Sequence, residues 1–325
     1  MNKVTLRTLA LSTVLCVICA PHVLAADGTG SQVYHWGGGQ VHVEPAADVA
    51  PDAGCGVAGL VQAQGTGNQT SYPNAPAGAD TTQTRVSASA TAAANLNCGN
   101  WNYQGVISAG NNFPYLYSYG NRGYTSTNLN GSGAFNVFWR DPSSFMVGLG
   151  VGRYMANQHD SGFVTLSGKN YDQTFNDWNG TAFAELYPNE QFTLGVTGFY
   201  ETGDAYSGFK NADDQLQVFG GSAYARYYAT PNLRFSVRGT ASQTNDTTAN
   251  VTSSNINAVV SADYKFDNSP LALFGGLRYG SNNSNNGSVF EPNTYVQGFA
   301  GVQIALGPHS NGSLLEQDRN GVALH

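Results

Sequence analysis

Apolar and polar residues alternate one by one along most of the chain after about residue 54. In the stretch LRFSVRGTASQ (233–243), leucine, phenylalanine and valine alternate with arginine, serine and arginine. Because successive side chains of an extended chain point to opposite faces, this period of two predicts β-strands. The pattern is clearest at 192–201, 233–243, 256–266 and 295–306, recurs at 131–140, 145–155, 174–187, 215–229 and 270–280, and is weaker at 55–64, 83–94 and 101–109. We expect about twelve strands, with ten or fourteen as alternatives.

The connections between these strands alternate strictly in length. Five are short and rich in Pro, Asn, Asp and Gly, which are turn-forming residues: 95–100, 141–144, 188–190, 230–232 and 267–270. Six are long and polar: 65–82, 110–129, 156–173, 202–214, 244–253 and 281–293. A Greek-key sandwich would mix the two kinds, whereas short turns at one end and long loops at the other are typical of an antiparallel up-and-down transmembrane β-barrel.

The two faces of the strands differ in the same sense. One face is apolar and carries no mid-strand charge, as in Phe192, Leu194 and Val196, and the opposite face carries polar and charged residues. Twelve strands enclose a bore too wide for side chains alone to fill. We therefore expect an all-β, closed barrel with its apolar face against lipid and its polar face inward. The aromatic residues near strand ends would form interfacial girdles, with plain core packing as the alternative: Trp101, Tyr103, Trp139, Phe145, Trp178, Tyr187, Tyr200, Tyr227, Tyr264 and Tyr279.

Residues 54–307 resemble, in this overall pattern, the porin-like outer-membrane β-barrels of Gram-negative bacteria. The last strand contains GVQIAL (301–306), which fits the terminal-strand signal that such barrels present to the barrel-assembly machinery. Phe299 stands where the family prefers a polar residue, and nineteen residues follow Leu306 where the family often ends on an aromatic. The resemblance implies outer-membrane localisation, contact with outer-membrane lipids, and passive transport of small polar solutes, and it leaves a homo-oligomer open.

The chain begins with features of a secretory signal. Residues 1–25 have a basic start, an apolar middle and small residues before Ala26, so we expect cleavage there, a retained anchor helix being the alternative. Removing them changes the formal net charge from −7 to −9, because Lys3 and Arg7 are lost and no acid is. An acidic chain with no basic tract disfavours nucleic-acid binding. Residues 26–53 are expected to form a disordered lead or a partial plug, and residues 308–325 a periplasmic tail.

Two cysteines remain after the signal, Cys55 and Cys98. In an exported chain such a pair is most simply one disulfide, with two free thiols as the alternative. In the expected layout Cys55 lies where the first strand begins and Cys98 lies in the first tight turn, so both are at the periplasmic rim.

The charged residues expected on the inner face gather in the C-terminal half of the barrel. Alternation places Arg226 opposite Arg234, Arg234 near Lys265, and Asp263 diagonal to both Arg234 and Arg238. Arginines in a channel raise the local anion concentration and set selectivity. The candidate pore-lining residues are Glu185, Arg226, Arg234, Arg238, Asp263, Lys265 and Arg278. The alternative is a salt-bridged lining of a plugged, non-conducting barrel that acts through its outer loops.

Enzymatic and metal-binding sites are weakly indicated. His159 and Asp160 lie in an expected outer loop and could pair with Asp172 or Asp204 in a rim-site hydrolase, although a solvated loop pair is the simpler interpretation. No nucleophile-elbow arrangement occurs. His35 and His42 lack a Cys or carboxylate at ligand spacing. The sequence therefore predicts a protein that is not an enzyme and that has no metal and no cofactor.

Overall fold

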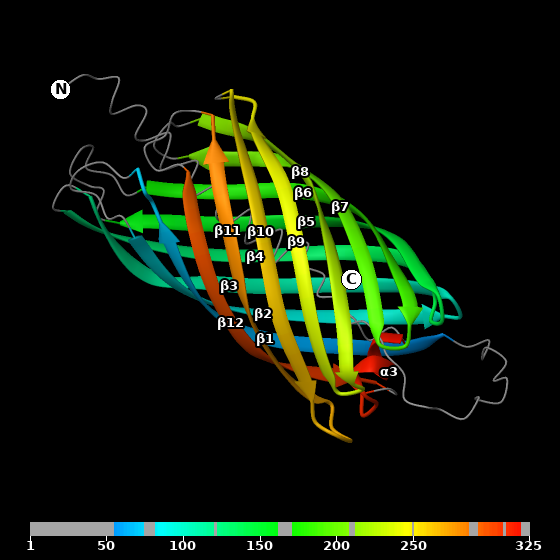
Figure 1. Cartoon of the computed structure of the whole chain (residues 1–325). Coiled ribbons are helices and arrows are strands. Elements are labelled where there is room, and N and C mark those ends of the chain that lie inside the picture. The colour runs from blue at the N-terminus through cyan, green and yellow to red at the C-terminus, as the bar shows by residue number, and fades with distance from the viewer. Residues whose placement is uncertain are drawn as a thin grey trace, which may run out of the picture.

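The computed structural model describes residues 55–74, 82–119, 122–161, 171–207, 212–248, 250–285, 292–307 and 310–319. These residues form twelve strands and one short helix (Figure 1). The strands are β1 (Gly56–Ser71), β2 (Thr82–Cys98), β3 (Trp101–Tyr119), β4 (Arg122–Asp141), β5 (Phe145–Ser161), β6 (Tyr171–Asn189), β7 (Phe192–Ser207), β8 (Ala212–Thr230), β9 (Leu233–Asp246), β10 (Val251–Lys265), β11 (Leu271–Ser284) and β12 (Asn293–Leu306), and the helix is α3 (Leu314–Arg319). The expected signal (1–25) and lead (26–53) lie outside the described residues. In the described part of the chain, no helix has the length and apolar character needed to cross a bilayer.

The twelve strands close into a single antiparallel barrel. Each strand pairs with its neighbours in the chain, and β1 pairs with β12 from Gly59↔Leu306 to Ser71↔Thr294. This closure leaves no open sheet edge, so every strand has a hydrogen-bonding partner on both sides. The predicted fold class and strand number are confirmed.

Tight turns gather at one end of the barrel, which we call the short-turn end. They lie at 99–100, 142–144, 190–191, 231–232 and 266–270, and β1 begins and β12 ends at the same end. Local chemistry forms these turns. In one of them, the Asp141 carboxylate accepts hydrogen bonds from the Ser143 amide (2.9 Å) and from the Ser143 and Ser144 hydroxyls (2.7 Å each). Short turns lie on the periplasmic side of transmembrane barrels.

At the opposite end the strands run further than the sequence predicted. A loop was expected over 110–129, but β3 continues to Tyr119 and β4 begins at Arg122. The expected loop at 156–173 is likewise shortened, because β5 continues to Ser161. Beyond the lipid neither face of a strand must be apolar, so the alternation that marks a strand fades while its backbone ladder continues.

The apolar face points out of the barrel and the polar face points in, as predicted. Val196, Val237 and Ile256 are each at least half exposed on the outside, whereas Arg234 and Asp263, on the opposite face, are buried. Among the predicted girdle residues, Trp101, Trp178 and Tyr279 are more than half exposed on the outer face. The prediction is wrong for Tyr187, whose side chain is buried and contacts Glu185.

Several inward aromatic rings lie directly over a glycine of the next strand. An added Cβ on Gly195 of β7 would lie 2.0 Å from Tyr224 Cζ of β8, and one on Gly276 of β11 would lie 2.6 Å from Phe299 Cζ of β12. The missing side chain makes room for the ring. Phe299, which departs from the terminal-strand pattern, is therefore a packed inner residue.

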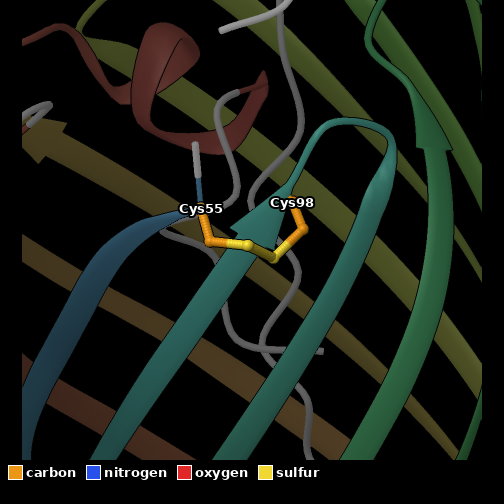
Figure 2. Close-up of a disulfide and its surroundings, with 2 residues drawn as sticks. All are labelled: Cys55 and Cys98. Atoms are coloured by element: carbon orange, nitrogen blue, oxygen red, sulfur yellow. A yellow bond between two sulfur atoms is a disulfide. The ribbon is translucent and has the colours of Figure 1, made fainter. Parts of the chain in front are cut away.

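Cys55 and Cys98 form a disulfide, as predicted (Figure 2). Cys55 immediately precedes β1, and Cys98 is the last residue of β2, directly before the turn at 99–100. The bond joins the short-turn ends of the first two strands. It therefore restrains the start of the barrel, where β1 must also pair with β12.

Candidate functional site

Buried charged side chains form a cluster inside the short-turn end, which we call the mouth cluster. It comprises Arg140 of β4, Glu185 of β6, Arg226 of β8, Arg234 of β9 and Asp263 of β10, none more than 5 % exposed. Two ion pairs tie it together, Arg226 Nη1 to Glu185 Oε1 at 3.1 Å and Arg234 Nη2 to Asp263 Oδ2 at 2.8 Å. Charges held this far from water must be paired to be tolerated.

Glu185 is the most connected acid of the mouth cluster. Its carboxylate accepts hydrogen bonds from the Tyr187 hydroxyl (3.0 Å), the Tyr224 hydroxyl (2.7 Å) and the Arg226 guanidinium. Tyr224 also has its ring 4.4 Å from Arg226 Cζ and 5.1 Å from Arg238 Cζ. The ring thus links the cluster to Arg238, which lies further into the barrel and is half-buried.

The register around the cluster differs by two residues from the one predicted. Arg234 lies opposite Tyr228 rather than Arg226, and Asp263 lies directly opposite Arg234 rather than diagonal to it. The β8–β9 pairing also shifts by one residue between Tyr228 and Thr230. The observed register places an ion pair where the predicted register placed two like charges opposite each other.

The remaining predicted lining residues are also inward but lie apart. Arg278 of β11 is buried and lies opposite Val259, whose other neighbour is Arg238. Lys265 lies at the rim, where its ammonium donates to the Ser269 main-chain oxygen in the β10–β11 turn. The structure therefore brings Glu185, Arg226, Arg234 and Asp263 together, places Arg238 beside them, and leaves Lys265 and Arg278 outside the cluster.

The sequence reading missed the helix that closes this end. After β12 the chain turns at Gly307, which has φ +100°, and an added Cβ there would lie 2.8 Å from the Val57 oxygen. Helix α3 follows at the short-turn end (Figure 1). Residues 313–316, SLLE, carry a capping-box signature, and the Ser313 hydroxyl accepts a hydrogen bond from the Glu316 amide at 3.1 Å. That signature was available in the sequence.

Helix α3 is docked by apolar and main-chain contacts. Leu314 and Leu315 are buried against Tyr228 and Ala272 of the barrel wall. Their amides donate to the Asn232 side-chain oxygen (3.3 Å) and to the Pro231 main-chain oxygen (3.2 Å) respectively, both in the β8–β9 turn. Burying two leucines contributes about 1.5–3 kcal/mol each. Residues 314–319 of the expected periplasmic tail thus pack against the barrel.

The far end of α3 meets the opposite wall. Arg140 of β4 donates to the Asp318 main-chain oxygen, and Arg319 donates to the Pro142 oxygen in the β4–β5 turn. The Arg319 Cζ lies 4.1 Å from the Tyr187 ring centroid. Sequence reasoning had assigned no role to Arg140, which sits directly before a predicted turn.

The Asp318 carboxylate points into the mouth cluster. It is 2 % exposed, and neither of its oxygens accepts a hydrogen bond from any described residue. Burial and the nearby Glu185 raise the pKa of Asp318 from 3.8 to about 7, against the opposing effect of the three arginines of the cluster. The charged and titratable groups around it are Arg140, Glu185, Tyr187, Arg226, Tyr228 and Arg234.

Docking of α3 is therefore expected to weaken as the pH rises. The docked carboxyl has a pKa of about 7 against 3.8 when free. The docked form therefore binds more protons, so this contribution to docking is complete below pH 3.8 and is lost as the pH rises through about 7. A nitroxide on Asn311→Cys, an exposed position before the helix, should show a larger mobile fraction at pH 8 than at pH 5. Asp318→Asn should remove most of this difference, and an unchanged pH dependence in that variant would contradict the assignment.

Elsewhere the inner face is lined by amides and hydroxyls. Buried amides bond to one another across strands, as in Asn136 Nδ2 to Gln104 Oε1 (3.0 Å) and Asn282 Nδ2 to Asn293 Oδ1 (3.0 Å). Small hydroxyl residues on the inner face keep part of their surface accessible inside the barrel: Thr66, Ser87, Ser89, Thr91, Ser132, Thr197, Ser222, Ser236 and Ser261. Amides and hydroxyls thus line much of the interior, together with inward apolar and aromatic side chains such as Phe138, Phe183 and Phe274.

The residues of the suggested rim hydrolase do not gather on the inner face. His159 is exposed on the outer face of β5, opposite Asp172 in the β5–β6 pairing, and Asp204 is exposed on the outer face of β7. The side chains of Asp160 and Asp172 lie outside those described. Among the side chains that are described, no three His, Cys, Asp or Glu residues come together in a way that could hold a metal ion.

Comparisons with known proteins bear on the fold. No family model and no curated protein matches the chain. An outer-membrane channel from Pseudomonas putida F1 is similar in structure, with a TM-score of 0.51 and 11 % identity over 81 % of this chain and all of that one. The β domain of the Bordetella autotransporter BrkA has a TM-score of 0.50 and 11 % identity over 77 % of this chain and all of that one. At these identities the likeness shows the fold alone.

The closed barrel, its apolar outer face and its polar interior together define the class of protein. Only closed barrels and helices satisfy the backbone in lipid, and the outward side chains here suit lipid along the strands. The chain is a Gram-negative outer-membrane β-barrel protein, located in the bacterial outer membrane.

Proposed function

We propose that this protein is a porin-like channel through which small polar solutes or ions diffuse passively. The observation that carries the proposal is the inner face, where charged, amide and hydroxyl side chains line a closed barrel and the smaller ones keep accessible surface inside it. A polar lumen within an apolar wall is the arrangement of water-filled barrels. Recognition of β12 by the assembly machinery and formation of a homo-oligomer stay predictions.

Planar-bilayer recording tests the channel. The purified protein should give discrete conductance steps, and Arg238→Gln should lower the anion-to-cation permeability ratio by roughly twofold, because a half-buried luminal cation attracts anions. Arg153→Gln is the matched control. Arg153 is exposed on the outer face, 5.2 Å from the Trp178 ring, and its loss should leave the ratio unchanged. A folded barrel that gives no steps under any condition would contradict the proposal.

A second function, a non-conducting surface barrel that acts through its outer loops, is favoured by the position of α3. The helix and the mouth cluster fill the short-turn end with buried side chains. Swelling of liposomes in small sugars or amino acids separates the two functions. Swelling supports a channel, whereas intact barrels with no swelling, even after α3 is released, support the surface protein.

A further inference from the structure

The barrel-wall residues of the mouth cluster carry an excess of formal positive charge. Its side chains from the barrel wall are three arginines and two acids, Glu185 and Asp263. Counted together, these five side chains carry one more positive than negative formal charge in a buried setting. Asp318 is the acid that faces this excess, and it comes from the helix rather than from the wall.

Asp318 is a poorly fitted partner for these arginines. Its carboxylate is buried, yet no described residue donates to either oxygen, and the Nη2 of Arg226 also lacks an acceptor among the described residues. Guanidinium groups bind carboxylates best through two parallel hydrogen bonds. The pKa of Asp318, raised to about 7, is consistent with a burial cost that no hydrogen bond offsets. A carboxylate free to turn could make the bonds that the tethered one does not.

We propose that the three arginines of the mouth cluster form a binding site for the carboxylate group of small organic acids, and that Asp318 occupies this site when α3 is docked. The inference rests on the proposed channel function and assigns its solute class, small monocarboxylates. A solute carboxylate and Asp318 then compete for one site, so α3 leaves the mouth when such a solute enters.

Chemical rescue tests the site directly. Asp318→Ala removes the carboxylate and leaves a space beside the arginines, so docking of α3 should weaken, and acetate at millimolar concentration should restore it. The nitroxide on Asn311→Cys reports docking through its mobile fraction. Asp318→Asn fills the same space and should not be rescued. Glu316→Gln, on the exposed side of the same helix, keeps a residue type that the capping box accepts and should neither weaken docking nor respond to acetate.

The arginines are tested in the same assay. Arg226→Gln is combined with Glu185→Gln, which removes both members of the ion pair together, so that neither is left without the other. In the Asp318→Ala background this pair of changes should raise the acetate concentration for half-rescue about tenfold, because a charge-assisted bond is lost. Acetate rescue that is undiminished by these changes would overturn the site.

Other outcomes separate the site from the channel. Equal rescue by chloride or phosphate at the same ionic strength would overturn the carboxylate assignment, and no rescue with a folded barrel would overturn the site itself. Rescue by acetate in a protein that never conducts would support the site and contradict the channel. Conductance in a protein that acetate does not rescue would support the channel and contradict the site.

Discussion

Single-channel conductance is expected to rise on the order of tenfold in the double variant Leu314→Asn/Leu315→Asn. These side chains are buried against Tyr228 and Ala272, and their loss removes the apolar contact that holds α3 in the mouth. A six-residue helix is not stable by itself in water, so an undocked α3 should unfold and leave the opening. The measurement is the step size in planar bilayers at fixed salt.

The control for this experiment must change the helix without releasing it. Glu316→Gln alters an exposed residue of α3 and should leave the step size as in the parent protein. Folding of each variant is checked by the shift in gel migration on heating. Equal conductance in the parent and in a correctly folded double variant would show that α3 does not obstruct the mouth.

Loss of one partner of the buried Arg226–Glu185 pair is expected to be the most damaging single change in the barrel. Arg226→Gln removes the arginine that is ion-paired with the buried Glu185 carboxylate, which costs about 3–5 kcal/mol of the free energy of unfolding. The Tyr187 and Tyr224 hydroxyls still donate to the carboxylate but cannot neutralise it. Urea unfolding in detergent or liposomes, followed by tryptophan fluorescence, measures the loss.

Two further variants show whether that loss of stability comes from the buried charge. Glu185→Gln/Arg226→Gln should recover most of the stability, because two neutral amides can bond to each other and to the tyrosines. Arg153→Gln, which removes an exposed arginine from the outer face, should cost less than about 1 kcal/mol. A double variant as unstable as Arg226→Gln would mean that the charge itself is not the cause.

The sequence was sufficient to predict the fold because lipid requires every strand to turn an apolar face outward. Residues such as Val237 and Ile256 had to face outward, and Arg234 and Asp263 had to face inward, so alternation alone assigned both faces correctly. The tight turns were located from Pro, Asn, Asp and Gly. The disulfide followed from having only two cysteines beyond the expected signal, placed at the same end of adjacent strands.

The sequence was insufficient for the register of the mouth cluster and for α3. At the far ends of β9 and β10 both faces are polar, so nothing in the pattern showed that Val251 pairs with Asp246, the register that sets Asp263 opposite Arg234. Nothing in the sequence pattern indicated the irregular pairing near Tyr228 either. The capping box of α3 did mark a helix, but its few apolar residues gave no sign of which surface they would cover.

Helix α3 also connects two parts of the barrel wall that are far apart in the sequence. Its first turn is hydrogen-bonded to the turn between β8 and β9, and its last residues are bonded through Arg140 and Arg319 to β4 and the turn that follows it, so it links two separate parts of the barrel wall. A closed barrel can deform toward an elliptical cross-section, and a helix bonded to two separate parts of its wall opposes that deformation. We therefore expect the barrel to be rounder and more rigid while α3 is docked. Release of α3 should make the whole barrel wall more flexible as well as open the mouth.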